Sequence, residues 1–469
     1  MINRSYNRKR IIRKWNKIKY KIMGLIGLFF LNVRYGFFKT FLICIFIVNQ
    51  IILIYDFTNF CGNKNSIEEV TSKNLVIFLI VIIITAIIGY IIRYEYFRYT
   101  IKVKNYSKKQ KLRLKENINL SDEYLASGYK IKIFNKGLEK NYTNIYDEYY
   151  VMSKEINRKL QNPNCSISVK AAFPFVINDE LRTFVPRIMY SNFKSNRYMH
   201  NGKLLKQNQS LLLNAENELD VMNKTISKVG YYIGQCTNEI VFKQFSNNRK
   251  ISKVFDGKEL LVDDSNVLHE LEDSKCANFL GASTLLFTVD NKILIAKQGS
   301  YSKSNPNRYA PTGSGSVEWR KDYKEIATSN LCEIITHAMD RELREEWNLP
   351  DKKSLKIITI LIGYVRLIER GGKPDYFGIS FTPRTFKELL NLSNNGTFIS
   401  NREDGFQSED YFILSFDDDS DMIKKLKNFC DEKKEKNELS IQLHIIVEIM
   451  SQMEEDKILN KYLEDLRRN

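Results

Sequence analysis

Residues 331–349 read LCEIITHAMDRELREEWNL, and this stretch decides the fold prediction because it carries two distinct faces of one helix. Its apolar side chains recur every four residues, which is typical of the buried stripe of an amphipathic helix. They are Ile335, Met339, Leu343 and Trp347. We therefore expect a helix that packs one side against a protein core.

Three carboxylates share the neighbouring face of this predicted helix. Glu342, Glu345 and Glu346 fall within an arc of roughly 100° at 100° per residue. Like charges at this spacing repel one another, and a divalent cation can relieve the repulsion. An alternative is an ordinary solvated face on which Arg341 and Arg344 pair with the acids.

Strand patterns lie on both sides of the helix. Short turns at Asp290-Asn291 and Gly371-Gly372 are each flanked by apolar segments, which predicts strands joined by tight turns. The predicted strands are residues 283–289, 292–297, 356–369 and 376–381. Strands, one helix and then strands predict an α+β domain, whose limits we place at residues 281–420.

The order of residues on the helix resembles the Nudix box, G-x5-E-x7-R-E-U-x-E-E-x-G-U, in which U is an aliphatic residue. Glu333 and, eight positions later, residues 341–349 match this pattern in register. Asn348 stands in place of the closing glycine, and Asn is the next-best residue for the left-handed conformation at a helix end. The helical half of the motif is therefore intact.

The loop half of the motif departs from the family pattern. Ala327 stands where the opening glycine is expected. Residues 311–318, PTGSGSVE, instead resemble the family's Pro-Gly-Gly-x-x-Val-Glu turn, displaced by an insertion at residues 319–330.

The Nudix resemblance implies a hydrolase site that uses Mg²⁺ or Mn²⁺. Mg²⁺ prefers oxygen ligands, so Glu342, Glu345 and Glu346 would be its ligands. Glu333 would join them as a fourth catalytic carboxylate from the helix start, with Arg341 steering a carboxylate. The metal would activate a bound water for attack on a diphosphate bridge.

Residues for holding a nucleotide are expected near the glycine turn. The candidates are Lys297, Arg308, Gly313 and Gly315. For the two cations, the role of an ordinary surface charge remains an equal alternative.

The charge distribution argues against a nucleic-acid-binding domain. The chain carries a net charge of +17, but residues 1–115 alone sum to +18, so the remaining 354 residues sum to −1. A duplex-binding domain would carry its own basic face. The basic residues instead flank two apolar runs near the N-terminus.

Those runs, residues 37–55 and 75–93, are each long enough to span a bilayer. A pair of buried core helices is the alternative. Residues 1–36 form a basic cytosolic or interfacial segment, and the loop at 56–74 has more acids than bases. This asymmetry predicts a membrane protein with both termini in the cytoplasm.

The remaining regions carry fewer signals. Residues 94–280 are expected to form a cytosolic linker and middle region, with a helical pattern around 211–229 and a strand-like piece at 230–233. No chemistry can be assigned to this region from its residues. Residues 421–469 are expected to form a C-terminal helical tail.

Taken together, two N-terminal transmembrane α-helices followed by a cytosolic α+β Nudix-like domain resemble the two-transmembrane Nudix effectors of bacterial CBASS anti-phage systems. In that family, a nucleotidyltransferase makes a cyclic oligonucleotide on infection, and the effector senses it and then compromises the inner membrane. The resemblance implies a cyclic nucleotide as partner, with no direct binding of nucleic acid. It also implies homo-oligomers, because two spans cannot enclose a pore alone.

Two alternatives remain open at this point. One is a membrane-tethered Nudix pyrophosphohydrolase acting on a nucleoside diphosphate derivative. The other is a structural membrane anchor, which would leave the acidic helix unexplained.

Overall fold

The computed structural model describes most of the chain beyond residue 100. The main described ranges are residues 101–134, 147–163, 165–171, 223–247, 253–299, 305–324, 327–392 and 408–468, with short pieces between 175 and 215. The chain divides into two compact units, and the candidate site lies wholly in the larger one. That unit comprises Asn105–Ile177, Asn201–Lys243 and Asp256–Asn469.

The predicted membrane spans at residues 37–55 and 75–93 lie outside the described residues. Within the ranges given above, none of the helices has the length and apolar character needed to cross a bilayer.

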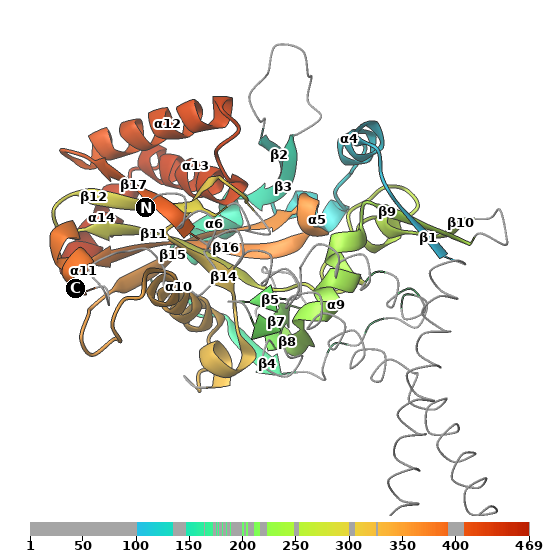
Figure 1. Ribbon diagram of the computed structural model, residues 1–469, viewed down its shortest axis with the longest axis horizontal. Helices are drawn as coiled ribbons and strands as arrows, with labels where there is room; N and C mark the ends of the chain where they lie inside the picture. The colour runs from blue at the N-terminus through green and yellow to red at the C-terminus, as the bar shows by residue number, and fades with distance from the viewer. Residues whose placement is uncertain are drawn as a thin grey trace, which may run out of the picture. The chain divides into compact units, whose positions relative to one another are not determined.

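The largest sheet in the described residues has nine strands (Figure 1). They are β2 (Tyr129–Phe134), β3 (Glu148–Ser153), β11 (Gly281–Thr288), β12 (Lys292–Gln298), β13 (Tyr309–Ala310), β14 (Gly313–Ser316), β15 (Ile358–Leu367), β16 (Lys373–Thr382) and β17 (Ser408–Ser415). The order is β13-β12-β11-β16-β15-β3-β2, with β14 paired to β11 and β17 paired to β12. Strands β11 and β16 run parallel, whereas β11 and β12 run antiparallel, so the sheet is mixed.

Both tight turns predicted from the sequence are confirmed. Strands β11 and β12 pair across the first turn, where Asn291 adopts a positive φ of 53°. Strands β15 and β16 pair across the second turn, where Gly371 and Gly372 have φ values of 68° and 70°. Glycine and asparagine tolerate this left-handed backbone better than other residues do.

Helices cover both faces of this sheet (Figure 1). Their bounds are α10 (Leu331–Trp347), α11 (Phe386–Leu392), α12 (Asp419–Glu435), α13 (Ile441–Glu455) and α14 (Leu459–Arg468). Alternate residues of β11 point to opposite faces. Leu285 and Phe287 join the core with α12, α13 and α14, whereas Leu286 joins the core with α10 and α11. Burial of both faces explains why β11 is apolar along most of its length.

The predicted acidic helix is confirmed as α10. Asn330 caps its start by accepting a hydrogen bond from the backbone N–H of Cys332, and Asn348 ends it with a φ of 52°. The expected apolar stripe is fully buried. Ile335, Met339, Leu343 and Trp347 are each at most 1% exposed.

The sheet extends beyond the predicted domain limits of 281–420. Strand β3 pairs with β15, with Val151 opposite Arg366, and β2 pairs with β3. The middle region therefore supplies two strands to the sheet. The described residues after 420 lie mostly in helices, as expected, and α12, α13 and α14 pack on the sheet through a shared core.

Two expectations for the middle region are wrong. Instead of one helix around 211–229, strands β7 (Leu211–Ala215) and β8 (Asn223–Gly230) form an antiparallel pair. Short apolar runs such as Leu-Leu-Leu fit helix and strand equally well, so periodicity could not decide. The strand expected at 230–233 is instead the start of helix α9 (Tyr231–Cys236), where Gly234 lies so close to the Phe279 ring that no Cβ would fit.

The chain has further described elements, some of which belong to the smaller unit. They are β1 (Ile101–Asn105), α4 (Lys108–Glu116), α5 (Asp122–Ala126), α6 (Lys154–Leu160), β4 (Ser168–Ala171), β5 (Met199–His200), β6 (Lys203–Leu204), η2 (Asn238–Ile240), β9 (Lys243–Asn247), β10 (Lys253–Asp256), η3 (Gly257–Leu260), the π-helix η4 (Trp319–Lys324) and η5 (Ile368–Arg370).

Candidate functional site

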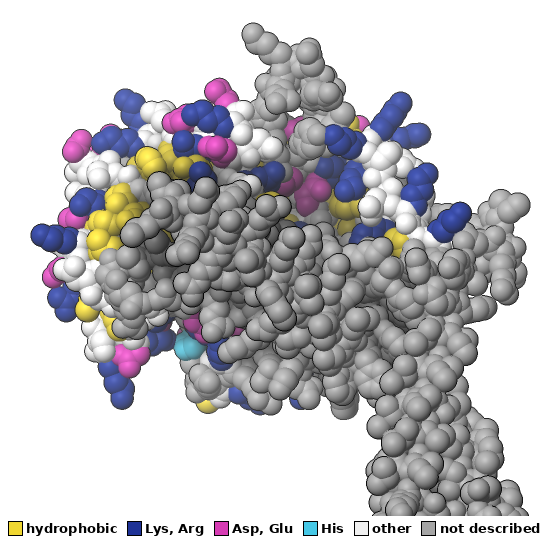
Figure 2. Space-filling model, viewed as in Figure 1, with side chains coloured by type: hydrophobic (Ala, Val, Ile, Leu, Met, Phe, Trp, Pro, Cys, Tyr) yellow, Lys and Arg dark blue, Asp and Glu magenta, His cyan; other side chains and the backbone are white. Residues whose placement is uncertain are grey.

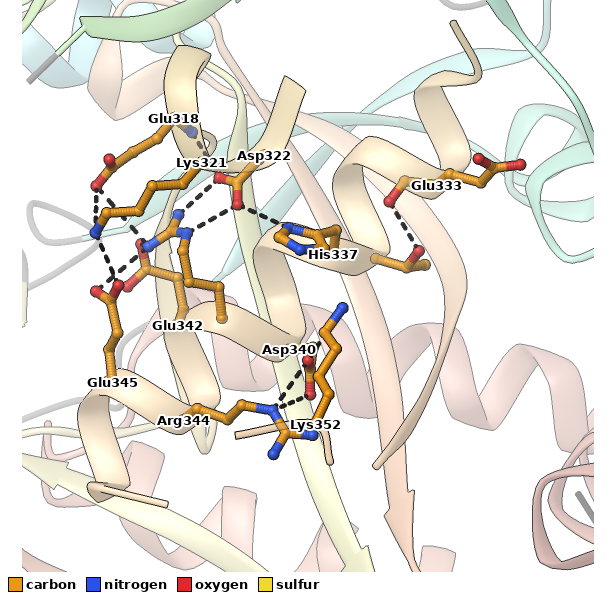
Figure 3. Close-up of polar contacts among 12 residues, drawn as sticks. Glu318, Lys321, Asp322, Glu333, His337, Asp340, Glu342, Arg344, Glu345 and Lys352 are labelled. Carbon is orange, nitrogen blue, oxygen red and sulfur yellow. Dashed lines mark hydrogen bonds and ion pairs between the residues drawn. The ribbon is translucent and has the colours of Figure 1, made fainter. Parts of the chain in front are cut away.

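The inserted segment begins with the π-helix η4, which packs against α10 and brings charged side chains to its acidic face (Figure 3). Lys321 and Asp322 are adjacent in this segment but lie in different surroundings. The Asp322 side chain is completely buried, whereas the Lys321 side chain is 42% exposed. The insertion therefore contributes to the site and does not merely interrupt the motif.

Asp322 holds Arg341 through two parallel contacts. Arg341 Nε and Nη2 each donate to a different carboxylate oxygen of Asp322 at 2.8 Å. His337 Nδ1 lies 3.1 Å from Asp322 Oδ1, and the backbone N–H of Glu318 donates to Oδ2 at 2.7 Å. Burial opposes ionisation of Asp322, but these hydrogen bonds with His337 and Arg341 outweigh it and lower its pKa below the ordinary value.

The other edge of the Arg341 guanidinium faces the helix carboxylates. Its Nη1 donates to Glu342 Oε1 at 2.8 Å and to Glu345 Oε2 at 3.4 Å. Its Nη2 also donates to the backbone oxygen of Ser316 at 3.0 Å. Asp322 binds one edge of the guanidinium group, and the helix carboxylates bind the other. Contacts on both edges fix the orientation of its plane, because the donors of arginine are arranged in a rigid fork.

Lys321 adds a second cation to the acidic face. Its Nζ lies 2.8 Å from Glu345 Oε1 and 3.6 Å from Glu318 Oε1 (Figure 3). Burial alone would lower the pKa of Lys321, but the hydrogen bond and charge of Glu345 raise it above the ordinary value. Burial raises the pKa of Glu318, although Arg341 and Lys321 oppose that rise.

Strand β14 approaches α10 so closely that a side chain at either of two glycines would need its neighbours to shift. A Cβ on Gly313 would lie 2.9 Å from the backbone of Leu343, and a Cβ on Gly315 would lie 2.1–2.4 Å from the Glu342 carboxylate. Between them, the backbone N–H of Ser314 donates to Glu346 Oε2 at 3.3 Å.

The structure thus brings together five of the predicted site residues. Glu342, Glu345, Glu346, Gly313 and Gly315 all lie where β14 meets α10.

Glu333 lies apart from this cluster, near the start of α10 (Figure 3). It is exposed, and its carboxylate accepts hydrogen bonds from Thr328 Oγ1 at 2.7 Å and Asn330 Nδ2 at 3.2 Å. These contacts tie Glu333 to the turn that caps the helix. In this arrangement Arg341 pairs with Asp322, Glu342 and Glu345.

Lys297 and Arg308 also lie away from the acidic cluster. Ala296 belongs to the core on the α10 side, so its neighbour Lys297 points to the opposite face of β12. There, Lys297 Nζ lies 5.2 Å from the centre of the Tyr309 ring. Arg308 pairs with Glu148 at 3.4 Å and is 18% exposed. These contacts match the alternative of ordinary cations, and the role of Lys297 and Arg308 in nucleotide binding stays a prediction.

Sequence reasoning missed Lys321, Asp322 and His337 as members of the site. The available signal was the charged run Trp-Arg-Lys-Asp-Tyr-Lys at residues 319–324, which opens an insertion directly after the glycine turn. A π-helical turn brings Asp322 opposite Arg341, and sequence spacing does not indicate such a turn.

The resemblance implied Mg²⁺ or Mn²⁺, so we asked whether these residues fit a divalent cation. Among the residues with described positions, no group of three or more His, Cys, Asp or Glu side chains is arranged to hold a metal. Each carboxylate oxygen of Glu345 faces a cation, Lys321 on one side and Arg341 on the other. As arranged, the acidic face is compensated by the chain's own cations and does not fit a divalent metal.

Comparison with known proteins gives only distant structural likenesses. No family model and no curated protein matches the chain. Among solved structures, DR0079 from Deinococcus radiodurans is 12% identical, with a TM-score of 0.21, covering 36% of this chain and 87% of that chain. Tm1382, described as a candidate Nudix hydrolase, is 11% identical, with a TM-score of 0.21, covering 46% of this chain and 87% of that chain.

At TM-scores of 0.21, these likenesses carry no argument. The structure shows a mixed α+β sheet with helices on both faces, and α10 carries the residues that resemble the Nudix box.

Proposed function

We propose that this protein is a membrane effector of a CBASS-type anti-phage system. Its Nudix-like domain would bind a cyclic nucleotide made on infection. Binding would then lead the N-terminal helices of an oligomer to disrupt the inner membrane, which ends in abortive infection. The proposal is supported by the order of features along the chain, in which two apolar runs with basic flanks precede the folded domain.

The basic flank continues into the described part of the chain. Helix α4 has no acid in its first turn, and Figure 2 shows Lys and Arg side chains gathered over it. Lys108, Lys109 and Arg113 are exposed. A basic surface shortly after residues 75–93 suits a cytoplasmic segment next to an anionic leaflet.

The observation that favours sensing over hydrolysis is the compensated acidic face. Lys321 and Arg341 already neutralise the carboxylates of Glu345 and Glu342. Catalysis by a metal-bound water needs carboxylates that are available to the metal. A domain whose acids are paired internally is better suited to bind a nucleotide than to cleave it.

One observation favours the tethered pyrophosphohydrolase as the second candidate. Glu342, Glu345 and Glu346 lie together on α10, and Lys321 is exposed enough to swing away from them. Under that function, substrate and metal would displace Lys321 together.

A binding screen separates the two functions. Full-length protein in detergent would be mixed with cyclic di- and trinucleotides and with nucleoside diphosphate derivatives, each with Mg²⁺. A true ligand at 100 times its Kd should stabilise the fold by about 2.7 kcal/mol, seen as a raised melting temperature. The effector predicts stabilisation by one cyclic nucleotide that is recovered intact by chromatography. Cleavage of a diphosphate derivative without any cyclic ligand would support the hydrolase instead.

A further inference from the structure

We propose that Lys321 is a built-in counter-ion of the acidic face. Its ammonium group lies between Glu318 and Glu345 and prevents divalent cations from binding there. This inference rests on the Nudix-like site proposed above and concerns how that site is regulated. It assigns a function to the insertion that separates the two halves of the motif.

Lys321 contacts two of the carboxylates on the acidic side of the site. Its Nζ is 2.8 Å from Glu345 Oε1 and 3.6 Å from Glu318 Oε1. A Mg²⁺ ion held between these two carboxylates would bind their oxygens at about 2.0–2.1 Å, so it would take the Glu345 oxygen that Lys321 contacts. The second Glu345 oxygen lies 3.4 Å from Arg341. Metal entry therefore requires that Lys321 leave.

The anchoring of the insertion explains why this ammonium is held near the acids. Asp322, the next residue, is completely buried and bound to Arg341 through both of its oxygens. The backbone at Lys321 is thus fixed against α10, while its side chain remains 42% exposed. A fixed backbone with a half-exposed side chain gives a cation that stays nearby and can still be displaced.

Displacement would have a measurable consequence for metal affinity. An ammonium on a short tether competes for the carboxylates at a high local concentration. Removing its charge leaves Glu318 and Glu345 without their nearest cation, which favours a divalent ion. We expect Lys321→Met to bind Mn²⁺ at least roughly tenfold more tightly than the wild type, a change of about 1.4 kcal/mol.

The test measures Mn²⁺ binding by electron paramagnetic resonance on the full-length, detergent-solubilised protein. Lys321→Arg keeps the charge and should bind as weakly as the wild type. Lys324→Met is the matched control, because Lys324 lies in the same segment but stacks on Trp319 at 5.7 Å. It should leave Mn²⁺ affinity unchanged. Lys321→Gln is measured in parallel as a second neutral variant, should Lys321→Met fail to fold.

Two results would overturn the proposal. One is equal Mn²⁺ affinity in the wild type and both neutral variants. The other is tight binding that survives in the double variant Lys321→Met with Glu345→Gln, because the metal would then sit elsewhere. Neither result bears on cyclic-nucleotide stabilisation, so failure here is distinguishable from failure of the proposed function.

Discussion

At the scale of single residues, the Asp322–Arg341 pair dominates the candidate site. Arg341 is 9% exposed and Asp322 is fully buried, so both charged groups are largely shielded from solvent. Such a pair is maintained because either partner alone would be an uncompensated buried charge. The guanidinium in turn orients Glu342, which makes Asp322 a positioning residue for the acidic face.

Asp322→Asn should therefore destabilise the protein strongly. The change keeps the shape of the side chain but leaves Arg341 without its main counter-charge, at an expected cost of about 3 kcal/mol. The melting temperature of the full-length protein measures this loss. Asp351→Asn is the control, because Asp351 is exposed and its carboxylate accepts hydrogen bonds from nearby Ser354. An equal loss in both variants would contradict the special role of Asp322.

Residue by residue, the sequence predicted one half of the site. Glu342, Glu345 and Glu346 could be placed together because helix geometry fixes their spacing. The positions of Lys321 and Asp322 could not be predicted. The sequence of the insertion does not indicate which of its residues will lie opposite which residues of α10.

At the scale of elements, the contact between β14 and α10 sets the geometry of the acidic face. The two glycines of β14 face different parts of the helix. Gly313 faces the Leu343 backbone, and Gly315 faces the movable end of the Glu342 side chain.

Alanine substitutions of these glycines should give different results. Gly313→Ala forces β14 and α10 apart, because backbone atoms 2.9 Å away cannot move alone. We expect a cost of about 1–3 kcal/mol, as in overpacked cores. Gly315→Ala should cost less stability, because the Glu342 carboxylate can turn aside, but it should perturb ligand binding more. Melting temperature and nucleotide affinity separate the two effects. A larger stability loss for Gly315→Ala would contradict this account of the packing.

Helix α13 carries a histidine whose burial predicts a pH dependence. His444 packs against the Phe134 ring at 4.5 Å, and burial lowers its pKa from 6.5 to about 4. The unfolded chain therefore binds a proton between about pH 6.5 and 4 that the folded chain does not. Stability should fall across that window by up to about 3 kcal/mol as pH decreases.

Denaturation midpoints at pH 7 and pH 4.5 measure this effect. His444→Gln should flatten the pH dependence over that range. His269→Gln is the matched control and should retain it. An unchanged slope in His444→Gln would show that other groups cause the loss.

Element prediction succeeded where a long period or a tight turn marked the element. Helix α10 was predicted from the repeated spacing of its apolar side chains, and the strands on either side of it were predicted from apolar segments that flank tight turns. Strands β2 and β3 were not predicted to join the sheet, because pairing between segments some 200 residues apart leaves no local pattern.

At the scale of the whole molecule, the asymmetry of charge is the main organising feature. Residues 1–115 hold the entire positive excess, and the rest of the chain is nearly neutral. This asymmetry predicts that both termini are cytoplasmic, so a membrane-impermeant thiol reagent should label Cys61 in intact cells. Cys165, which is partly exposed, should be labelled only after lysis. Labelling of Cys165 from outside would contradict the orientation.

The final prediction concerns the coupling of the folded domain to residues 1–95. A resting effector must be harmless, so expression alone should leave the membrane potential unchanged. Nucleotide binding must favour the active state over the resting one by several kcal/mol to switch most of the population. Co-expression with a cyclic-oligonucleotide synthase should therefore depolarise the inner membrane, as measured with a potential-sensitive dye.

Deleting residues 1–95 should abolish this depolarisation while leaving nucleotide binding measurable. The full-length variant Asp351→Asn, altered only at an exposed position, should depolarise cells as the wild type does. If the truncated protein reproduced the full phenotype, the membrane segments would be dispensable. Toxicity would then have to arise from nucleotide degradation, and the hydrolase would replace the effector as the proposed function.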